Sequence, residues 1–279
     1  MKNIYFLNGK PADPRVLLRM MNPKSAGIFE TFRVYNGKIF RFEEHLDRLQ
    51  ESALTVGLRP FLVKKSIKRE VEKAVRGYGK NEAVVRITWM EEGLIVMVGE
   101  RKAPPELYQT GIALQTSPIR RSLSNAAPPE AKSTDYMNAL MATLEPRPAE
   151  VYEWVFLDQQ GFVTEVRIGN LFIVDQSSRK PRLRTPPLQG ILNGVTRRFV
   201  IECALLEGLE VREEPLTRHD IYTAHESFLT NTSWEVLPVR SLDGRLVGHS
   251  IPGSITSRLH QSFIKRVYKE CPLLKSKER

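Results

Sequence analysis

Cysteine is scarce in this sequence, which has only Cys203 and Cys271 among its 279 residues. Two cysteines so far apart form neither a disulfide framework nor a CxxC motif. This use of cysteine is typical of proteins in a reduced compartment. We therefore expect a cytoplasmic protein whose fold does not depend on disulfides.

Long apolar runs are also missing. The longest aliphatic run is Leu94-Ile95-Val96-Met97-Val98, whereas a helix needs about 20 apolar residues to cross a bilayer. Residues 1–9 lack the apolar core of a secretory signal. The sequence therefore predicts neither a membrane span nor export.

Acidic residues are outnumbered by basic ones, 32 against 42, which gives a formal net charge of +10. Such an excess suits a polyanion partner, but it also suits a site that holds small anions. The densest basic stretch, residues 64–69, is followed by Glu70 and Glu72, which is typical of a solvated helix face. Because the positive charge is spread along the chain, we expect no nucleic acid partner.

Several common functional motifs are absent. Gly77-x-Gly79 lacks the third glycine of a dinucleotide-binding loop, and there is no Walker A motif or G-x-S-x-G elbow. The five histidines have no metal-ligand spacing, so we expect no metal site. The composition, 41% hydrophobic and 27% charged, is that of a globular protein. The length corresponds to about two domains.

The residue pattern of the N-terminal part predicts an α+β domain, which we place at residues 1–116. Asn36-Gly37 separates two runs of alternating polarity, and this is the strongest short-range signal for a β-hairpin. Apolar residues at helical spacing predict two helices after the hairpin. The predicted elements are strands at 4–7, 28–35 and 38–41, helices at 42–54 and 62–75, and strands at 83–89, 94–98 and 112–116.

The C-terminal part predicts a second domain at residues 132–279. A stretch rich in Ser, Pro and Arg precedes it, and we interpret residues 117–131 as the connector. The predicted elements are a helix at 134–145, strands at 151–157, 162–165 and 170–174, and a helix at 196–207.

Some segments become informative through their order and spacing. They are residues 27–37 with 44–49, 131–138, 163–172, 183–186 with 190–197, and 229–239. Together they resemble the class IV pyridoxal-phosphate enzymes, which include branched-chain and D-amino acid aminotransferases and 4-amino-4-deoxychorismate lyase. The resemblance extends from Asn8 to about Val239. It meets the long signature of the family at every fixed position except Arg167, where a small residue is usual.

The resemblance implies a two-domain, fold-type IV α+β protein. The N-terminal domain would be a smaller α/β sandwich, and the larger C-terminal domain would contain a pseudo-barrel sheet. It also implies pyridoxal 5′-phosphate (PLP) as cofactor between the domains, amino acid and keto acid substrates, and a homodimer.

Each part of the cofactor requires a protein group. By resemblance, Lys132 forms the Schiff base with the aldehyde, and Glu165 binds the ring nitrogen. Taken alone, a surface charge is the alternative for both residues. Arg167 lies two residues after Glu165, and residues so spaced in a strand share a face. It could therefore compete for Glu165 or lower its pKa, or point at a substrate carboxylate.

Phosphate requires hydrogen-bond donors. A helix beginning near Val195 and Thr196 would offer free backbone N–H groups, and Gly194 would allow close approach. Arg48 and Thr232 complete the phosphate site by resemblance. The alternatives are an ordinary helix start and, for Arg48, a helix arginine in a salt bridge.

The remaining candidates concern the substrate and the ring. Arg86 stands where branched-chain aminotransferases often have an arginine, and Arg33 on the paired strand is a second candidate for the substrate carboxylate. An exposed strand arginine is the alternative for both. Tyr136 is implied near the phenolic oxygen of the cofactor, with a core tyrosine as the alternative.

Our leading hypothesis is an aminotransferase that moves an amino group between a branched-chain-like amino acid and a 2-keto acid. The alternatives are aminodeoxychorismate lyase, which eliminates pyruvate, and a non-catalytic binding protein on the same fold. Three features depart from the family pattern: residues 24–27, the short tip after Trp89, and Arg167. All three concern substrate choice more than the cofactor.

Overall fold

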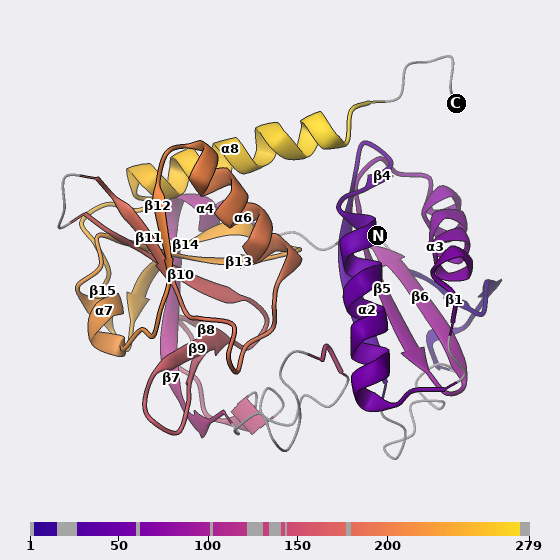
Figure 1. The fold of residues 1–279 in the computed structure, drawn as a ribbon, viewed down its shortest axis with the longest axis horizontal. Coiled ribbons are helices and arrows are strands. Elements are labelled where there is room, and N and C mark those ends of the chain that lie inside the picture. The colour runs from indigo at the N-terminus through magenta and orange to yellow at the C-terminus, as the bar shows by residue number, and fades with distance from the viewer. Residues whose placement is uncertain are drawn as a thin grey trace. The chain divides into compact units, whose positions relative to one another are not determined.

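The structure is a computed structural model that describes residues 3–15, 27–59, 62–100, 103–121, 131–133, 141–142, 144–176 and 180–273. The chain divides into two compact units, and Figure 1 shows the elements of each. The first unit comprises Met1–Lys102, Ala131–Asp135 and Arg266–Arg279, and the second comprises Ala103–Glu130 and Tyr136–Lys265. The fold is α+β, as the sequence predicted.

Where it is described, the first unit contains an antiparallel six-stranded sheet and helices that pack on it. The strand order is β2-β1-β6-β5-β3-β4. Its elements are β1 (Ile4–Leu7), β2 (Lys10–Pro11), β3 (Ile28–Tyr35), β4 (Lys38–Ile39), α2 (Phe42–Val56), α3 (Lys64–Tyr78), β5 (Ala83–Met90) and β6 (Gly93–Gly99).

The predicted hairpin and both predicted helices of this unit are confirmed. Asn36 and Gly37 have φ of 52° and 77°, which is the left-handed pair that a two-residue hairpin turn requires. In β3, alternate residues face the helices, so Phe32 and Val34 are fully buried in one core with Leu46 of α2. Glu30 lies on the same face and is also fully buried.

The second unit contains a curled nine-stranded sheet (Figure 1). Its strand order is β12-β11-β10-β13-β14-β7-β8-β9, and β15 pairs with β14 outside this path. Its elements are α4 (Leu107–Thr110), β7 (Ile112–Arg120), β8 (Val151–Leu157), β9 (Val163–Val166), β10 (Asn170–Asp175), β11 (Arg182–Thr185), α6 (Val195–Leu206), β12 (Glu210–Glu213), α7 (Arg218–Tyr222), β13 (Glu226–Asn231), β14 (Glu235–Leu242), β15 (Arg245–Leu246) and α8 (Ser254–Glu270), whose last residues belong to the first unit.

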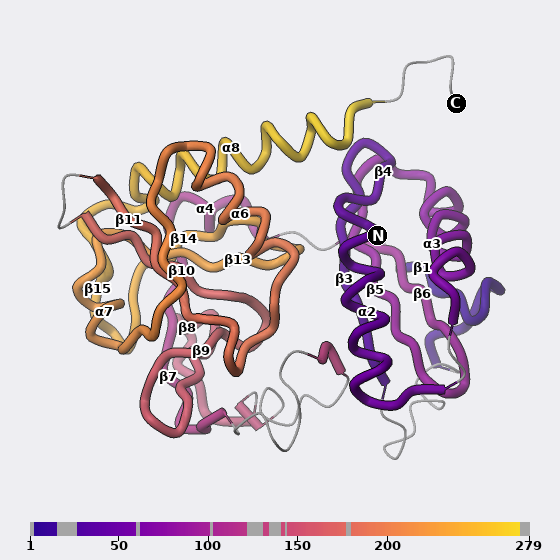
Figure 2. Tube along the Cα trace, in the orientation of Figure 1, coloured from indigo at the N-terminus to yellow at the C-terminus, as the bar shows by residue number. Residues whose placement is uncertain are grey.

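Parallel pairing joins segments of the second unit that are distant in sequence. Strand β7 runs parallel to both β14 and β8, and β11 runs parallel to β12. Figure 2 shows β7 next to β8 in this unit. The predicted N-terminal domain, residues 1–116, and the predicted connector therefore differ from the observed division. Residues 112–116 belong to the second sheet, and β7 continues to Arg120, because its hydrogen-bonding partners are β8 and β14.

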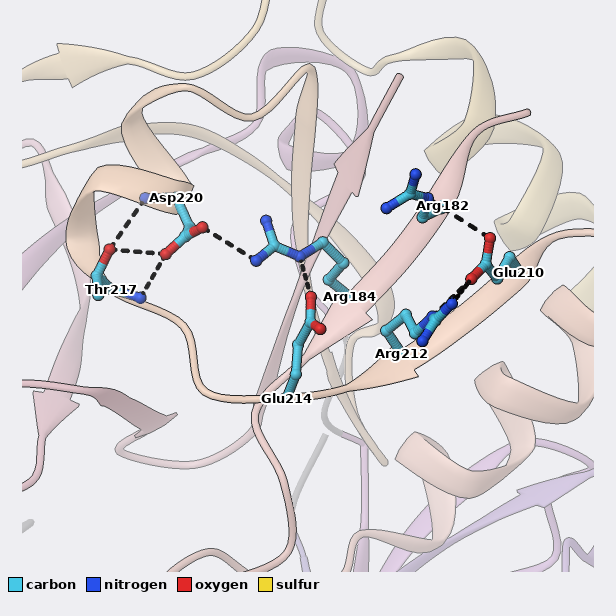
Figure 3. Close-up of polar contacts among 7 residues, drawn as sticks. All are labelled: Arg182, Arg184, Glu210, Arg212, Glu214, Thr217 and Asp220. Atoms are coloured by element: carbon cyan, nitrogen blue, oxygen red, sulfur yellow. Dashed lines mark hydrogen bonds and ion pairs between the residues drawn. The ribbon is translucent and has the colours of Figure 1, made fainter. Parts of the chain in front are cut away.

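Charged residues organise the outer strands β11 and β12 (Figure 3). Arg184 on β11 forms ion pairs with Glu214 and, at 3.0 Å, with Asp220. Asp220 also accepts a 2.8 Å hydrogen bond from the backbone N–H of Thr217, and so completes a capping box at the start of α7. The network thus connects the sheet edge to α7.

A buried carboxylate fixes the start of α8. Glu226 accepts hydrogen bonds from the backbone N–H of Ile255 at 2.9 Å and of Thr256 at 2.7 Å, and one from the Thr256 hydroxyl at 2.7 Å. These bonds satisfy helix-terminal donors that have no partner inside the helix. Among the helices in the described part of the chain, none is long and apolar enough to cross a membrane.

Candidate active site

The open edge of β3 holds the segment that contains Lys132. Because β4 pairs only with the far end of β3, the beginning of β3 has room for another chain segment. The backbone N–H of Phe29 donates to the Lys132 carbonyl at 2.9 Å, and Ile28 forms an antiparallel bridge with Ser133. On its other side, the Lys132 N–H donates to the Ser52 hydroxyl of α2 at 3.0 Å. The Lys132 backbone is therefore held by both β3 and α2.

The Lys132 side chain lies beside the aromatic ring of Phe29, a residue of β3. Its Nζ is 5.1 Å from the centre of the Phe29 ring, and the guanidinium of Arg86 is 3.7 Å from that centre. Two candidate residues thus meet at one ring. A cation over an aromatic face is attracted by the ring quadrupole, which favours this placement of both charges.

Arg33 is not the exposed strand arginine that the sequence allowed. Its residue exposure is 7%, its guanidinium stacks 4.9 Å from the Tyr35 ring centre, and it lies 3.9 Å from the Glu82 carboxylate. Arg86 on the neighbouring strand is half-buried. Within the unit, Arg33 and Arg86 lie on the face of the sheet opposite to Glu30, as the alternation of side chains requires.

Arg48 belongs to a buried charge cluster that the sequence analysis missed. Its Nε and Nη2 donate to the two oxygens of Glu30 at 2.6 and 2.8 Å, and His45 Nδ1 lies 2.8 Å from Glu30 Oε2. All three residues are buried. Arg48 therefore forms the helix salt bridge that the sequence offered as an alternative. Its role in binding phosphate stays a prediction.

The protonation states of this cluster follow from its geometry. Burial opposes ionisation of Glu30, but the Arg48 guanidinium and then His45 hold the pKa of this carboxyl well below its ordinary value. Burial, together with the charges of Arg48 and Lys132, lowers the pKa of His45 although Glu30 raises it. The imidazole is therefore neutral, and its Nδ1–H donates to Glu30, because an ionised carboxylate can only accept.

Glu165 is buried in the second unit with both oxygens in polar contact. Its Oε2 accepts from Asn170 Nδ2 at 3.3 Å and from the Leu192 backbone N–H at 3.2 Å. Its Oε1 forms an ion pair with Arg121, which directly follows β7. Its exposure is 6%, so the alternative of a surface acid is wrong.

Arg167 does not contact Glu165, which was one of the possibilities that the sequence left open. It donates to Glu153 of β8 through Nε at 3.0 Å and through Nη2 at 3.3 Å. The physical reason is that β9 ends at Val166, so Arg167 lies in a turn and the strand alternation no longer applies. The predicted competitor for Glu165 is thus replaced by Arg121.

The start of α6 is shaped for close approach. Helix α6 begins at Val195 after Gly194, and both Val195 and Thr196 are buried. A Cβ atom on Gly194 would clash with Asn170 Oδ1, so any larger residue requires Asn170 to move. Asn170 Nδ2 also donates to the Leu192 carbonyl at 3.1 Å, and it thereby connects this loop to Glu165.

The other candidates have simpler placements. Thr232 lies in the turn between β13 and β14, where the Asn231 side chain accepts from the backbone N–H groups of Ser233 and Trp234, each at 2.8 Å. Tyr136 lies outside the described residues, as do most of the predicted helix at 134–145 and residues 24–26. Within the described residues, no group of three or more His, Cys, Asp or Glu is placed to hold a metal ion.

The structure therefore distributes the predicted residues over both units. Lys132, Arg48, Arg33 and Arg86 belong to the first unit, and Glu165, Arg167, Val195, Thr196 and Thr232 belong to the second. Sequence reasoning missed Glu30, His45, Ser52, Arg121 and Asn170. One signal was available, because Glu30 interrupts the apolar face of a strand, and a charge at such a position must be paired.

Comparison with known proteins gives consistent matches. Residues 27–242 match the family model described as amino-transferase class IV. A Methanocaldococcus jannaschii protein named "Putative branched-chain-amino-acid aminotransferase" is 36% identical over 250 residues, which is 85% of each chain. The branched-chain-amino-acid aminotransferase of Pseudomonas aeruginosa is 30% identical over 261 residues, 86% of this chain and 84% of its own.

Solved structures agree. A branched-chain amino acid aminotransferase from Thermotoga maritima, described as putative, superposes with a TM-score of 0.84 and 27% identity, covering 95% of this chain and 96% of that one. The Escherichia coli branched-chain amino acid aminotransferase gives a TM-score of 0.84 and 26% identity, covering 99% and 97%. Another branched-chain amino acid aminotransferase, solved with pyridoxamine 5′-phosphate, also gives a TM-score of 0.84 at 26% identity, covering 96% and 95%.

Proposed function

Because the chain belongs to the class IV aminotransferase family, we propose that it moves an amino group between a branched-chain amino acid and a 2-keto acid. It is a PLP-dependent transaminase. The observation that carries the choice of substrate is that relatives with high coverage are named branched-chain aminotransferases. The same observation disfavours the lyase alternative, and family membership disfavours the non-catalytic one.

The residues present suit the chemistry of PLP. Glu165 offers a buried carboxylate whose Oε2 is oriented by two donors. Its Oε1, which pairs with Arg121, is the oxygen that would face a protonated ring nitrogen. Gly194 packs against Asn170 Oδ1 so closely that no Cβ fits without movement, and it precedes a helix start whose N–H groups favour an anion. We assign the aldehyde to Lys132, the ring nitrogen to Glu165, and the phosphate to Arg48, Val195, Thr196 and Thr232.

When bound, PLP supplies an electron sink for the bonds of the substrate α-carbon. Lys132 takes the proton from that carbon and later returns one, so its amine must alternate between protonation states. Glu165 keeps the ring nitrogen protonated because an ionised carboxylate favours a cation beside it. We assign the substrate carboxylate to Arg86, with Arg33 as a second candidate, and we assign Tyr136 to the ring oxygen. Arg167 is held by Glu153, so we retain it only as an influence on substrate choice.

The decisive experiment combines absorption with turnover. Purified protein given PLP should show a visible band that the Lys132→Ala variant lacks, while Lys180→Ala, in the loop before β11, should keep it. The protein should then convert leucine, isoleucine or valine with 2-oxoglutarate as acceptor. Turnover of aminodeoxychorismate alone would overturn the aminotransferase proposal, and a protein that never binds PLP would overturn the enzyme itself.

Two finer features remain predictions of the family resemblance. One is a homodimer, and the other is a cytoplasmic location. The absence of a nucleic acid partner is likewise still a prediction. None of them is needed for the residue assignments above.

A further inference from the structure

A buried carboxylate stands where the pattern of β3 calls for an apolar residue. Glu30 has no exposed surface and shares its face with Ile28, Phe32 and Val34. A carboxylate in such a place is strongly destabilising unless charged or polar groups satisfy it. Its presence in the core therefore requires partners.

Helix α2 supplies those partners from consecutive turns. His45 and Arg48 are three residues apart, which places them on one face of the helix. Together they make three contacts of 2.6 to 2.8 Å with the two Glu30 oxygens. Oε2 also lies 3.3 Å from the backbone N–H of Thr31. The Glu30 carboxylate thus links β3 to α2 through an ion pair and hydrogen bonds.

The same two elements hold Lys132. Phe29, the residue before Glu30, donates its backbone N–H to the Lys132 carbonyl. Ser52, one turn after Arg48 on α2, accepts the Lys132 N–H and is itself 1% exposed. The backbone position of Lys132 therefore depends on how β3 and α2 are placed against each other.

We propose that Glu30 is a positioning residue, whose carboxylate sets β3 against α2 and so holds both the Arg48 guanidinium and the Lys132 backbone in place for the cofactor. This inference rests on the proposed function, which assigns Arg48 to the phosphate and Lys132 to the aldehyde. Glu30 itself touches neither substrate nor cofactor in this role. It acts through two residues that are far apart in sequence.

The test compares Glu30→Gln with Glu226→Gln in the full-length protein. Both changes neutralise one buried carboxylate that joins two elements, but Glu226 caps α8 and has no contact with Glu30, Arg48 or Lys132 among its described bonds. The measurements are the thermal midpoint, the dissociation constant of PLP from absorption titration, and the pH at which the visible band changes. Glu30→Gln should weaken PLP binding by about tenfold, the effect of losing a charge-assisted bond, and should shift the pH of the spectral change. Glu226→Gln should lower only the thermal midpoint.

A second variant covers the case in which Glu30→Gln does not fold. Ser52→Ala removes the bond to the Lys132 backbone without leaving a charge unpaired, and it should also weaken PLP binding and move the spectral change. Wild-type PLP affinity and spectrum in a folded Glu30→Gln protein, or in Ser52→Ala when Glu30→Gln is unfolded, would overturn the inference. A wild-type protein without the visible band would instead overturn the proposed function and the inference with it.

Discussion

Two fully buried glutamates, Glu30 and Glu153, differ in the direction in which their surroundings shift the carboxyl pKa. Glu30 has Arg48 and His45 against it, and the pKa of its carboxyl falls. Glu153 forms an ion pair with Arg167, whose side chain is 30% exposed, and the charge of Arg147 also acts on it. Burial raises the pKa of Glu153 more than Arg167 lowers it. The number and burial of the partners, rather than burial of the carboxylate alone, thus decide which protonation state the fold favours.

The cluster around Glu30 predicts how stability depends on pH. His45 and Glu30 both have a lowered pKa, so each binds fewer protons in the folded protein than in the unfolded chain. Their contribution to stability is complete above their ordinary pKa values of 6.5 and 4.5 and is lost as pH falls. The free energy of unfolding should therefore decrease below pH 6.5 and more steeply below pH 4.5.

His45→Gln isolates the first part of this loss. It should flatten the decrease that begins below pH 6.5, where one proton contributes up to about 1.4 kcal/mol per pH unit. The measurement is urea unfolding between pH 8 and pH 5. Exposed His249→Gln is the matched control and should keep the wild-type dependence. An equal slope in His45→Gln and the wild type would contradict the assignment of a neutral, buried His45.

Two glycines, one inside α3 and one just before α6, have different surroundings. Gly77 lies inside α3, where a Cβ would meet only Phe6 Cζ at 3.9 Å, an ordinary contact. Gly194 precedes α6, and its φ of −66° suits any residue. At Gly194 the obstacle is therefore space and not backbone conformation, since a Cβ atom would displace Asn170.

The same substitution at both glycines should have opposite effects. Gly77→Ala should raise the free energy of unfolding by about 0.5 kcal/mol, because alanine favours helix. Gly194→Ala should lower it by about 1–3 kcal/mol, the range for overpacking, and should weaken PLP binding because Asn170 and the start of α6 must move. Chemical unfolding and PLP titration of both variants measure these effects. Tight PLP binding by Gly194→Ala would show that the start of α6 does not hold the phosphate.

The whole chain does not divide into two continuous pieces. It enters the second unit at Ala103, contributes Ala131–Asp135 to the first, and returns to the first after Lys265. Side-chain hydrogen bonds attach the returning C-terminal segment to the rest of the first unit. Arg41 donates to both oxygens of Glu270 at 2.9 Å, and the Asn36 side chain donates to the Cys271 carbonyl at 2.9 Å. The hairpin turn of the first unit is thus tied to the C-terminal segment.

Removing residues 266–279 should therefore destabilise the first unit although its sheet stays complete. The deletion loses the Glu270 and Cys271 contacts and the Tyr268 ring, whose centre is 5.9 Å from that of Tyr35. Hydrogen exchange should show lower protection in β3 and β4. The single change Arg41→Ala should produce a smaller loss in the same strands. Unchanged protection in the truncated protein would mean that the C-terminal segment does not support the hairpin.

Much of the local structure could be predicted because its causes are local. The hairpin at Asn36-Gly37 depends on two residues that tolerate positive φ, and α2 depends on apolar spacing within one helix. The failures involve pairings at long range. Residues 112–116 were assigned to the N-terminal domain although they pair with β8 and β14, and the pairing of Arg167 with Glu153 was not foreseen, because nothing in a short window shows which strand lies alongside.

By itself, the sequence determined the hairpin, both helices α2 and α3 and most strands of the first unit, and also the family and hence the chemistry, because turn residues, periodicity and motif spacing are properties of short segments. Only the tertiary structure decided that Arg121 meets Glu165, that Glu30 is buried against Arg48, and that Lys132 completes the edge of β3. Each of these contacts joins residues separated by many positions. Their energies depend on burial and on the distance between charges, which exist only once the chain has folded.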